Sequence, residues 1–388
     1  MRKVISDKVA GLQPSGIRKF FDIVSEMDDV ISLGVGEPDF DTPWHIRDEG
    51  IYSLEKGRTF YTSNSGLKEL REEICKYLKR RCNLDYEVAE TLVTVGGSEA
   101  IDLAMRVLLD PGDEVLIPQP SFVSYLPCAV MADGVPVIID LKAENEFRLT
   151  AQELEDAITE KTKLLVLPFP NNPTGAVMTR ADLEAIAEVI LRHDIYVLSD
   201  EIYSELTYGE DHVSIASLPG MKERTITMNG FSKAYAMTGW RLGYACAPKE
   251  IIVQMTKVHQ FAIMCAPTNS QYAAVEALRN GDGDVQEMRE SYNARRRFVL
   301  NAFEEMGLPC FEPLGAFYAF PCIKEFGMTS DEFAERLLKE EKVAVVPGTA
   351  FGDCGEGFLR ISYAYSLDDL REALGRLAVF VKRLKEKK

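Results

Sequence analysis

The chain has 388 residues, of which 46% are apolar, and its glycines and prolines are spread along it without a biased tract, which is typical of a folded protein. At this length, one large domain with a smaller companion is favoured over a single core. The formal net charge of −17 disfavours nucleic acids and anionic membranes as partners, because they carry charge of the same sign.

The cysteines and the N-terminal segment bear on metal binding and cell compartment. The eight cysteines form no Cys-x-x-Cys pair and do not fall beside any of the four histidines, so neither a zinc site nor a redox motif is predicted. The segment MRKVISDKVAGLQPSG lacks the apolar stretch of a signal peptide, and no run approaches the roughly 18 apolar residues of a membrane span. These features predict a cytoplasmic protein without a metal.

From about residue 90, short apolar runs alternate with longer helical stretches, as in a parallel sheet covered by helices. The first unit is a strand at 91–95, a glycine turn and a helix whose apolar residues recur at helical spacing. The runs KLLVLP and IYVLSD are apolar without alternation, which indicates strands buried on both faces. Further predicted elements are the strands VLIP at 115–118, 135–139, 163–167, 195–198, 224–228 and 242–245, and a helix at 180–192.

At Asp284 the pattern changes to a long amphipathic helix that Gly307 is expected to end. It is followed by the predicted strands 315–320, 343–347 and 357–362, a helix over 330–340 between the first two, and a final helix from Ser366. We therefore predict a large α/β domain over 48–284. A smaller α+β domain is predicted to combine 285–388 with residues 1–47.

The segment SKAYAMTGWRLGY at 232–244 contains the sharpest chemical signal. An isolated loop lysine is usually solvent-exposed. Lys233, however, lies in a short loop of small residues after a predicted buried strand, where partial desolvation lowers an amine pKa and makes the nucleophilic form available. Arg241 offers a planar fork of donors suited to a phosphate.

Two further positions lie where strands of such a sheet end. Gly97, Ser98 and Glu99 open a helix directly after a strand, so their free backbone N–H groups and the helix dipole could hold an anion. Asp200 follows the apolar run YVLS at the edge of the sheet where open α/β folds bind ligands. The alternative for Asp200 is an ordinary helix N-cap.

The segment 232–244 resembles the lysine motif of the class I and II aminotransferases, which are pyridoxal 5′-phosphate (PLP) enzymes of fold type I. Six other segments resemble motifs of this family in the expected order, and the resemblance spans nearly the whole chain. Seven motifs in order are far more specific than any one alone. The six are LGVGEPDFDTP at 33–43, YTSNSGLKELREEI at 61–74, VGGSEA at 95–100, NNPTGA at 171–176, SDEIY at 199–203 and GFLRIS at 357–362.

The resemblance implies a large domain with a mostly parallel seven-stranded sheet flanked by helices and a smaller α+β domain. It also implies that Lys233 carries PLP as an imine and acts as the general base. Asp200 is implied to keep the ring nitrogen protonated, so that the ring can accept electrons. Asn172 and Tyr203 are implied to hydrogen-bond the phenolic oxygen of PLP.

The remaining roles are also implied by the resemblance. Gly97, Ser98 and Glu99, with Ser232 and Arg241, are expected at the phosphate. One departure from the family pattern is Gly230, where many relatives carry a phosphate-binding serine, so the phosphate is expected to have one side-chain donor fewer; Ser232 is not a secure replacement.

Phe122 matches the aromatic ring that stacks on PLP, although core packing is the competing interpretation for any phenylalanine. Arg360 alternates with apolar neighbours in a predicted strand, which by itself fits a surface arginine. The resemblance implies that Arg360, supported by the Gly36 backbone, binds the substrate α-carboxylate, with Phe122 and Asn172 nearby. It implies that Tyr61 reaches the phosphate in the partner subunit, which predicts an obligate homodimer with shared active sites.

The resemblance points to the branch of aspartate, aromatic and N-acetyl-diaminopimelate aminotransferases. It implies ping-pong transfer of an amino group from an L-amino acid to a 2-oxo acid such as 2-oxoglutarate. A C–S β-lyase or a decarboxylase on the same scaffold is the alternative enzyme, and a PLP-binding regulator is an alternative of another class, although no basic DNA-binding segment is visible. No second arginine stands out for a distal carboxylate, so we expect broad specificity.

Overall fold

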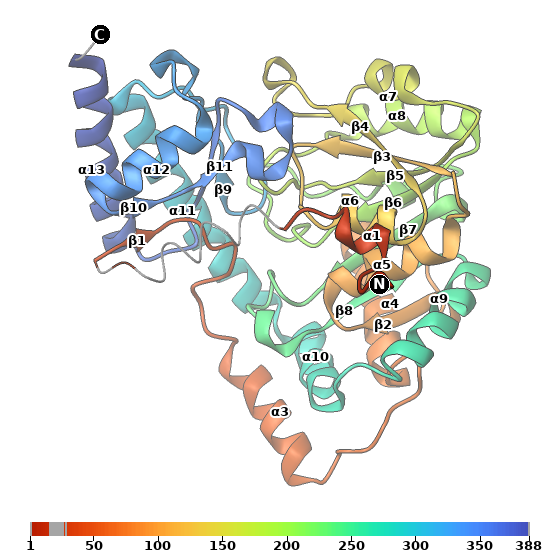
Figure 1. Cartoon of the computed structure of the whole chain (residues 1–388). Coiled ribbons are helices and arrows are strands. Elements are labelled where there is room, and N and C mark those ends of the chain that lie inside the picture. Colours follow the sequence, from red (N-terminus) through yellow and green to blue (C-terminus); the bar gives the residue numbers. More distant parts are fainter. Residues whose placement is uncertain (1, 15–26, 28, 387–388) are drawn as a thin grey trace.

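The computed structural model describes residues 2–14, 27 and 29–386. Its centre is a seven-stranded sheet in the order β2-β8-β7-β6-β5-β3-β4 (Figure 1). Among these strands, β8 is antiparallel to both of its neighbours and the other pairs are parallel. The mostly parallel sheet predicted from the sequence is confirmed. The strands are β2 (Thr91–Thr94), β3 (Glu114–Gln119), β4 (Val135–Asp140), β5 (Thr162–Leu167), β6 (Tyr196–Asp200), β7 (Thr225–Gly230) and β8 (Gly243–Cys246).

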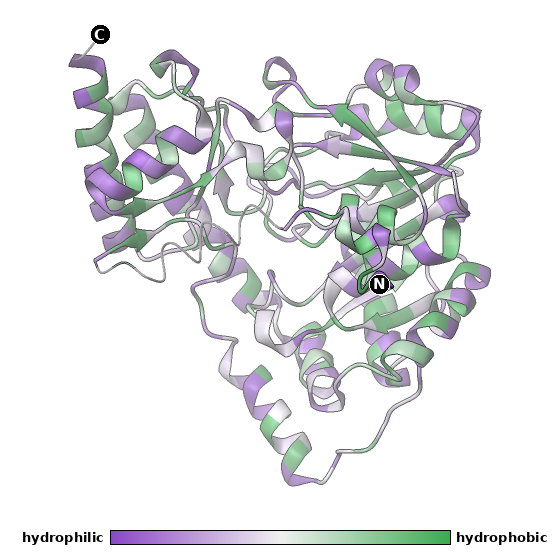
Figure 2. Cartoon of the chain, in the orientation of Figure 1, coloured by the Kyte–Doolittle hydropathy of each residue, from purple (hydrophilic) through white to green (hydrophobic). Residues whose placement is uncertain are grey.

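Helices cover both faces of this sheet, which explains why its strands lack alternation. Leu164 and Val166 of β5 pack into one cluster with α5, α6 and α9, whereas Leu165 and Leu167 pack into another with α7 and α8. Figure 2 shows the same pattern: the strands are largely hydrophobic, and the helices are hydrophobic on one side and hydrophilic on the other. The helices are α3 (Trp44–Glu55), α4 (Lys68–Cys82), α5 (Gly96–Leu108), α6 (Tyr125–Met131), α7 (Ala151–Ala157), α8 (Arg180–His193), α9 (Lys249–Ala262) and α10 (Thr268–Asn280).

A second group of elements forms around a three-stranded antiparallel sheet in the order β11-β12-β9. The long helix beside it ends at Gly307, whose φ of 64° lies in the left-handed region, as predicted. These elements, with the exception of β11, contribute side chains to one buried apolar cluster. They are β9 (Tyr318–Ala319), β11 (Val346–Pro347), β12 (Leu359–Ser362), α11 (Asp282–Met306), α12 (Ser330–Glu341) and α13 (Leu367–Glu386).

Two strand predictions in this region are wrong in extent. The strand predicted over 315–320 is reduced to β9, because Ala316 has a φ of 57° that an extended strand cannot contain. The strand predicted over 343–347 is divided in two. Its first part, β10 (Val343–Ala344), pairs with β1 (Ile31–Ser32), whereas its second part is β11, which pairs with β12.

The N-terminal residues contact both groups of elements. The helix α1 (Asp7–Ala10) lies near the end of α6, where Lys8 Nζ is 2.6 Å from Asp133 Oδ1. Further along, β1 joins β10 of the second group. Residues 15–26 and 28 lie outside the described residues, and the division into 48–284 and 1–47 with 285–388 stays a prediction. Within the described ranges, no helix combines the length and apolar character needed to cross a membrane.

Candidate active site

A cavity of about 520 Å³ opens where the C-terminal ends of the parallel strands face the second sheet. Its lining comes from α5, α6, β6, β7, β9 and β12 and from the segments that follow β1, β3, β5, β6 and β7. Eleven residues expected from the sequence lie in this lining: Gly36, Gly97, Ser98, Phe122, Asn172, Asp200, Tyr203, Ser232, Lys233, Arg241 and Arg360. Segments far apart in the chain therefore meet at one site.

Lys233 lies in the loop between β7 and β8. Its Nζ donates a hydrogen bond to the carbonyl oxygen of Gly36 at 2.6 Å and lies 5.9 Å from the centre of the Tyr203 ring. Burial lowers the pKa of the Lys233 amine to about 8, so the neutral form is accessible near physiological pH. Such an amine can act as a nucleophile or as a general base.

Asp200 is the last residue of β6 and is buried. Its Oδ2 accepts a hydrogen bond from the Tyr125 hydroxyl at 2.6 Å, and its Oδ1 accepts one from the Ile202 N–H at 3.1 Å. Burial raises the pKa of Asp200 to about 6, while these hydrogen bonds act in the opposite direction. A turn rather than a helix follows, so the N-cap alternative for Asp200 is wrong.

Arg360 extends from β12 and is only 2% exposed, so the surface-arginine alternative is wrong. Its Nη1 donates to Asn172 Oδ1 at 2.9 Å, and its Nη2 donates to the carbonyl oxygen of Gly34. Its Nε has no hydrogen-bond partner among the described residues, which also provide no carboxylate at ion-pair distance. A buried guanidinium without a counter-ion favours binding of an anion.

The first turn of α5 supplies a second place for an anion. Gly97 and Ser98 line the cavity together with Arg241, whose Nη1 is held by the carbonyl oxygen of Thr238 at 3.0 Å. The approach is close, because a Cβ on Gly96 would lie 2.7 Å from Arg241 Nη2. Backbone N–H groups at a helix start and a guanidinium together suit a phosphate.

The glycine at position 230 has a packing reason in this fold. A Cβ on Gly230 would lie 3.0 Å from both the Cα of Gly243 and the carbonyl oxygen of Leu242, where β7 and β8 approach closely. A serine in this backbone would therefore need a shift of β8. Ser232 lines the cavity nearby.

Two expected residues do not line the cavity. The side chain of Glu99 turns toward α9, where its Oε1 is 2.6 Å from His259 Nδ1. Tyr61 is 80% exposed on the surface. Glu99 is near the cavity through its backbone, which lies in the first turn of α5, and not through its side chain.

Sequence reasoning missed several lining residues, among them Tyr125, Tyr318 and Glu37. The hydroxyl groups of Tyr318 and Tyr203 are 2.8 Å apart, and the Thr238 hydroxyl donates to Glu37. Glu37 lies within the motif at 33–43, but no role was predicted for it from the sequence, and no local pattern marks Tyr125 or Tyr318. The described residues contain no cluster of His, Cys, Asp or Glu that could hold a metal ion.

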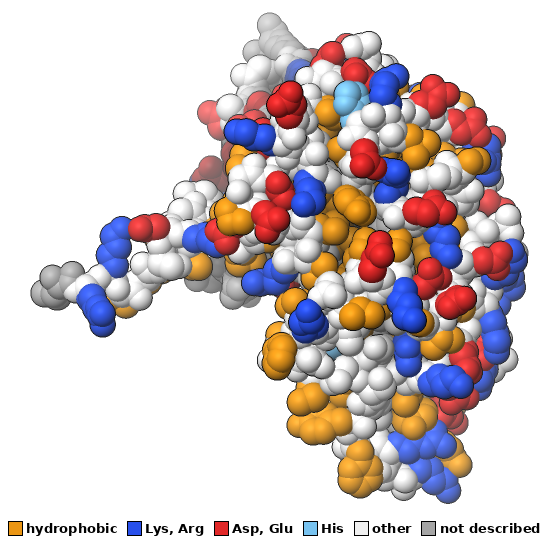
Figure 3. All heavy atoms as spheres, turned by 90° about the vertical axis from the view of Figure 1, so that its right-hand side faces the viewer, with side chains coloured by type: hydrophobic (Ala, Val, Ile, Leu, Met, Phe, Trp, Pro, Cys, Tyr) orange, Lys and Arg blue, Asp and Glu red, His pale blue; other side chains and the backbone are white. Residues whose placement is uncertain are grey.

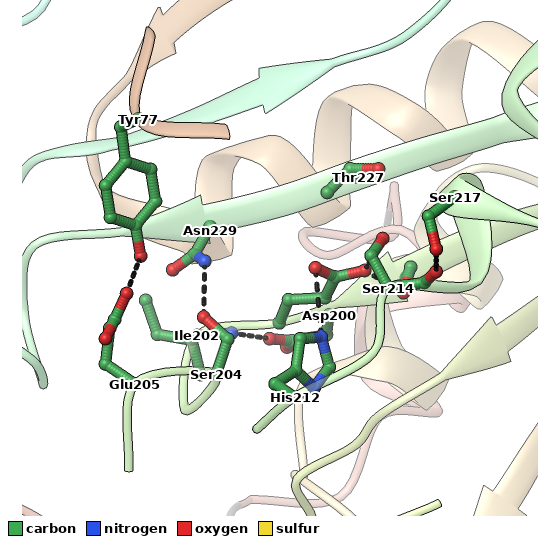
Figure 4. A network of polar contacts seen from close by, with 12 residues as sticks. Tyr77, Asp200, Ile202, Ser204, Glu205, His212, Ser214, Ser217, Thr227 and Asn229 are labelled. Carbon is green, nitrogen blue, oxygen red and sulfur yellow. Dashed lines mark hydrogen bonds and ion pairs between the residues drawn. The ribbon is translucent and has the colours of Figure 1, made fainter. Parts of the chain in front are cut away.

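A buried polar network lies behind Asp200 (Figure 4). Glu201 Oε1 accepts hydrogen bonds from the hydroxyls of Ser199 at 2.9 Å and Ser214 at 2.6 Å. Its Oε2 is 3.1 Å from Nε2 of His212. These contacts fix the turn that follows β6 and thereby the backbone around Asp200.

Comparisons with known proteins agree with this arrangement. The family model for aminotransferases of class I and II matches residues 28–377. An aspartate aminotransferase of Pyrococcus abyssi is 50% identical over 99% of both chains, and aromatic-amino-acid aminotransferase 2 of Thermococcus litoralis is 48% identical over 99% of both. The structure of Thermus thermophilus aspartate aminotransferase with maleate superposes with a TM-score of 0.93, at 40% identity over 97% of this chain and 99% of that one.

Proposed function

Because the chain belongs to the class I and II aminotransferases, we propose that it uses PLP, bound in the cavity around Lys233, to move amino groups from aspartate, aromatic or related L-amino acids to 2-oxo acids such as 2-oxoglutarate. Transfer of an amino group is the reaction of its relatives, and this enzyme is a transferase. The observation that carries the proposal is that the Lys233 amine, the Asp200 carboxylate and the Arg360 guanidinium meet in one cavity. The guanidinium has no carboxylate partner among the described residues. The lyase, decarboxylase and regulator alternatives are less favoured by these relatives.

The lining fits the chemical groups of PLP. Gly97, Ser98 and Arg241, with Ser232 beside them, offer donors for the phosphate. The Asp200 carboxylate offers a negative charge for the ring nitrogen, and the Phe122 ring offers a stacking face. When bound, PLP supplies a ring that accepts the electrons released at the substrate α-carbon.

Asn172 and Tyr203 are proposed to donate hydrogen bonds to the phenolic oxygen. Arg360 occupies Oδ1 of Asn172, so the amide is oriented with Nδ2 available as a donor. The Tyr203 hydroxyl is in turn paired with that of Tyr318 at 2.8 Å, which fixes its position. Both side chains are therefore held in place before a ligand binds.

Lys233 is the proposed general base. In that role its amine would take the proton from the substrate α-carbon and hold it for delivery to a different carbon. Racemisation, in contrast, returns the proton to the α-carbon. With a pKa of about 8, both the neutral and the charged forms of the Lys233 amine are populated near neutral pH. Gly36, whose carbonyl oxygen accepts from Nζ, keeps the amine at the cavity wall.

Arg360 is proposed to bind the α-carboxylate of every substrate, with Gly36 at its side. Arg360→Ala should weaken transition-state binding of acidic and aromatic donors alike by about 2–5 kcal/mol, because one partner of a hydrogen-bonded charge pair is lost. The measurement is kcat/KM over a panel of amino donors and 2-oxo acids, with the wild type in parallel. In the lining, Arg241 is the other arginine, so we expect the wild type to accept several donors.

Arg296→Ala is the matched control, because Arg296 is a buried arginine of α11 that pairs with Glu312 outside the cavity. It separates lost packing from lost substrate binding. A loss on Arg360→Ala confined to dicarboxylic substrates would reassign Arg360 to the side-chain pocket. Strict use of one donor by the wild type would refute the broad pocket, and no transfer with any pair would refute the function itself.

We also propose a homodimer with shared active sites. Hydrophobic side chains gather on the lower part of the face in Figure 3. Phe60 and Tyr61 are 81% and 80% exposed, and the segment that contains them is tied to another with exposed apolar residues by the hydrogen bond from Asn64 Nδ2 to the carbonyl oxygen of Met264. Apolar surface of this kind favours burial against a second copy of the chain.

The eight cysteines are free, which supports the proposal that the protein resides in a reducing cytoplasm.

Mixed dimers test whether Tyr61 acts across the interface. Tyr61→Phe alone should weaken retention of PLP. In a heterodimer with Lys233→Ala, a Tyr61 that acts in the partner subunit leaves one site with neither change and one with both. Wild-type-like activity from half of the heterodimer sites is expected, whereas activity of the Tyr61→Phe type alone would show that Tyr61 acts within its own subunit.

A further inference from the structure

Tyr125 is a buried tyrosine at the start of α6 that no sequence motif marks. Its hydroxyl donates to Asp200 Oδ2 at 2.6 Å, and its ring meets that of Phe122 edge-on with the centres 5.7 Å apart. Among the described residues, the other hydrogen bond to this carboxylate is from the Ile202 N–H. Within the described structure, Tyr125 is therefore the residue whose side chain donates a hydrogen bond to the Asp200 carboxylate.

The charges around Asp200 do not favour its ionised form strongly. Glu201, the next residue, is buried and raises the pKa of Asp200, whereas the Lys233 ammonium lowers it. The other titratable groups nearby are Tyr203, from the same turn, and His212, which pairs with Glu201. With burial as the largest effect, the pKa of Asp200 lies at about 6, close enough to neutrality for one hydrogen bond to decide its charge.

We propose that Tyr125 is a positioning residue that keeps Asp200 charged at neutral pH and directs its carboxylate into the cavity. A hydrogen bond to a charged group is strong enough to move a titration midpoint by about one to two pH units. Without the phenol, about half or more of Asp200 would be protonated at pH 7. The inference rests on the proposed function in one respect, because the charge matters if Asp200 faces the ring nitrogen of PLP.

The alternative is that Asp200 merely satisfies a buried phenol, as any acceptor could. Tyr77 provides the comparison, because its hydroxyl donates to the buried carboxylate of Glu205 (Figure 4). Neither Tyr77 nor Glu205 is among the residues that line the cavity. Tyr125→Phe and Tyr77→Phe both remove a phenol hydroxyl from a buried acid. Both are expected to cost some stability, but Tyr125→Phe alone should change the titration of Asp200.

The test uses the apoenzyme with aspartate labelled at the side-chain carboxyl carbon. The Asp200 signal, assigned by its loss in Asp200→Asn, is followed by NMR as a function of pH. In Tyr125→Phe its midpoint should rise by about one to two pH units, because the hydrogen bond to the charged form is lost. In Tyr77→Phe it should stay near that of the wild type.

The enzyme loaded with PLP gives a second readout. In Tyr125→Phe the acid limb of the kcat profile should move to higher pH, and activity should recover as the pH rises, with KM nearly unchanged. An unshifted midpoint and limb in the folded variant would overturn the role of Tyr125 and leave the proposed function intact, whereas a wild type without amino transfer would refute the function alone. If Tyr125→Phe does not fold, 3-fluorotyrosine at position 125 keeps the shape and donates more strongly, so the midpoint should fall; an unchanged midpoint would again contradict the inference.

Discussion

Lys233→Ala should lower kcat by about 10²–10⁴-fold or more, the range associated with loss of a general base, and should bind PLP only noncovalently. Lys233 is the cavity-lining lysine, and its lowered pKa fits both covalent attachment and proton transfer. Purified wild type should be yellow from PLP attached to the enzyme. The measurements are the absorption spectrum, kcat with saturating PLP, and peptide mapping after borohydride reduction.

Lys222→Ala serves as the control, because Lys222 is a part-buried lysine that pairs with Glu90 outside the cavity. That variant should keep the yellow colour and the turnover. If borohydride instead fixes PLP on another lysine of the wild type, the central assignment of Lys233 is wrong.

Asp200→Asn should fold normally and lose about 10²–10³-fold in the rate of α-proton removal, comparable to loss of one preorganised electrostatic contact. An amide cannot keep the ring nitrogen protonated as a carboxylate does. The rate is measured in single turnovers with a donor carrying deuterium at the α-carbon. Near-normal turnover with saturating PLP would contradict the proposed role.

The Asp200→Asn substitution should also change the free energy of unfolding of the apoenzyme in a pH-dependent way. Because burial raises the pKa of Asp200 from its ordinary value to about 6, the stability that its neutral form contributes is present at low pH and is lost as the pH rises through 6. At pH 8, apo Asp200→Asn should therefore be more stable than the wild type, by about 2–3 kcal/mol if no other contact changes. Asp102→Asn on α5, whose carboxylate pairs with Arg106 outside the cavity lining, should show neither effect.

The sheet could be predicted from the sequence because its strands, with the exception of the edge strand β4, are largely buried on both faces. The seven strands fall within about two residues of their predicted positions, and capping explains the start of α8, where Thr179 and Asp182 bond each other's backbone. The short strands of the second sheet were harder. Whether Val343 and Val346 belong to one strand or two depends on partners distant in the chain, which periodicity does not reveal.

The site was predictable to the extent that strand ends and family motifs mark it. Lys233, Asp200 and Arg360 were found in this way, but the burial of Arg360 was not, because alternation in a strand does not distinguish a cavity from solvent. Tyr318 reaches Tyr203 from 115 residues away, and only the tertiary fold brings them together. The contact between the Glu99 side chain and His259 of α9 also depends on the tertiary fold, so the sequence did not reveal it.

The three ionisable side chains of the cavity have a consequence for how the protein can be altered. Burial disfavours the charged forms of Lys233, Asp200 and Arg360, so we expect well-packed apolar residues at these positions to leave the free chain as stable or more stable. Substitutions chosen for thermal resistance alone would therefore be drawn to these positions and would remove the chemistry. Engineering for robustness has to leave them unchanged and seek its gains in helix caps and surface loops, where stability and activity do not compete.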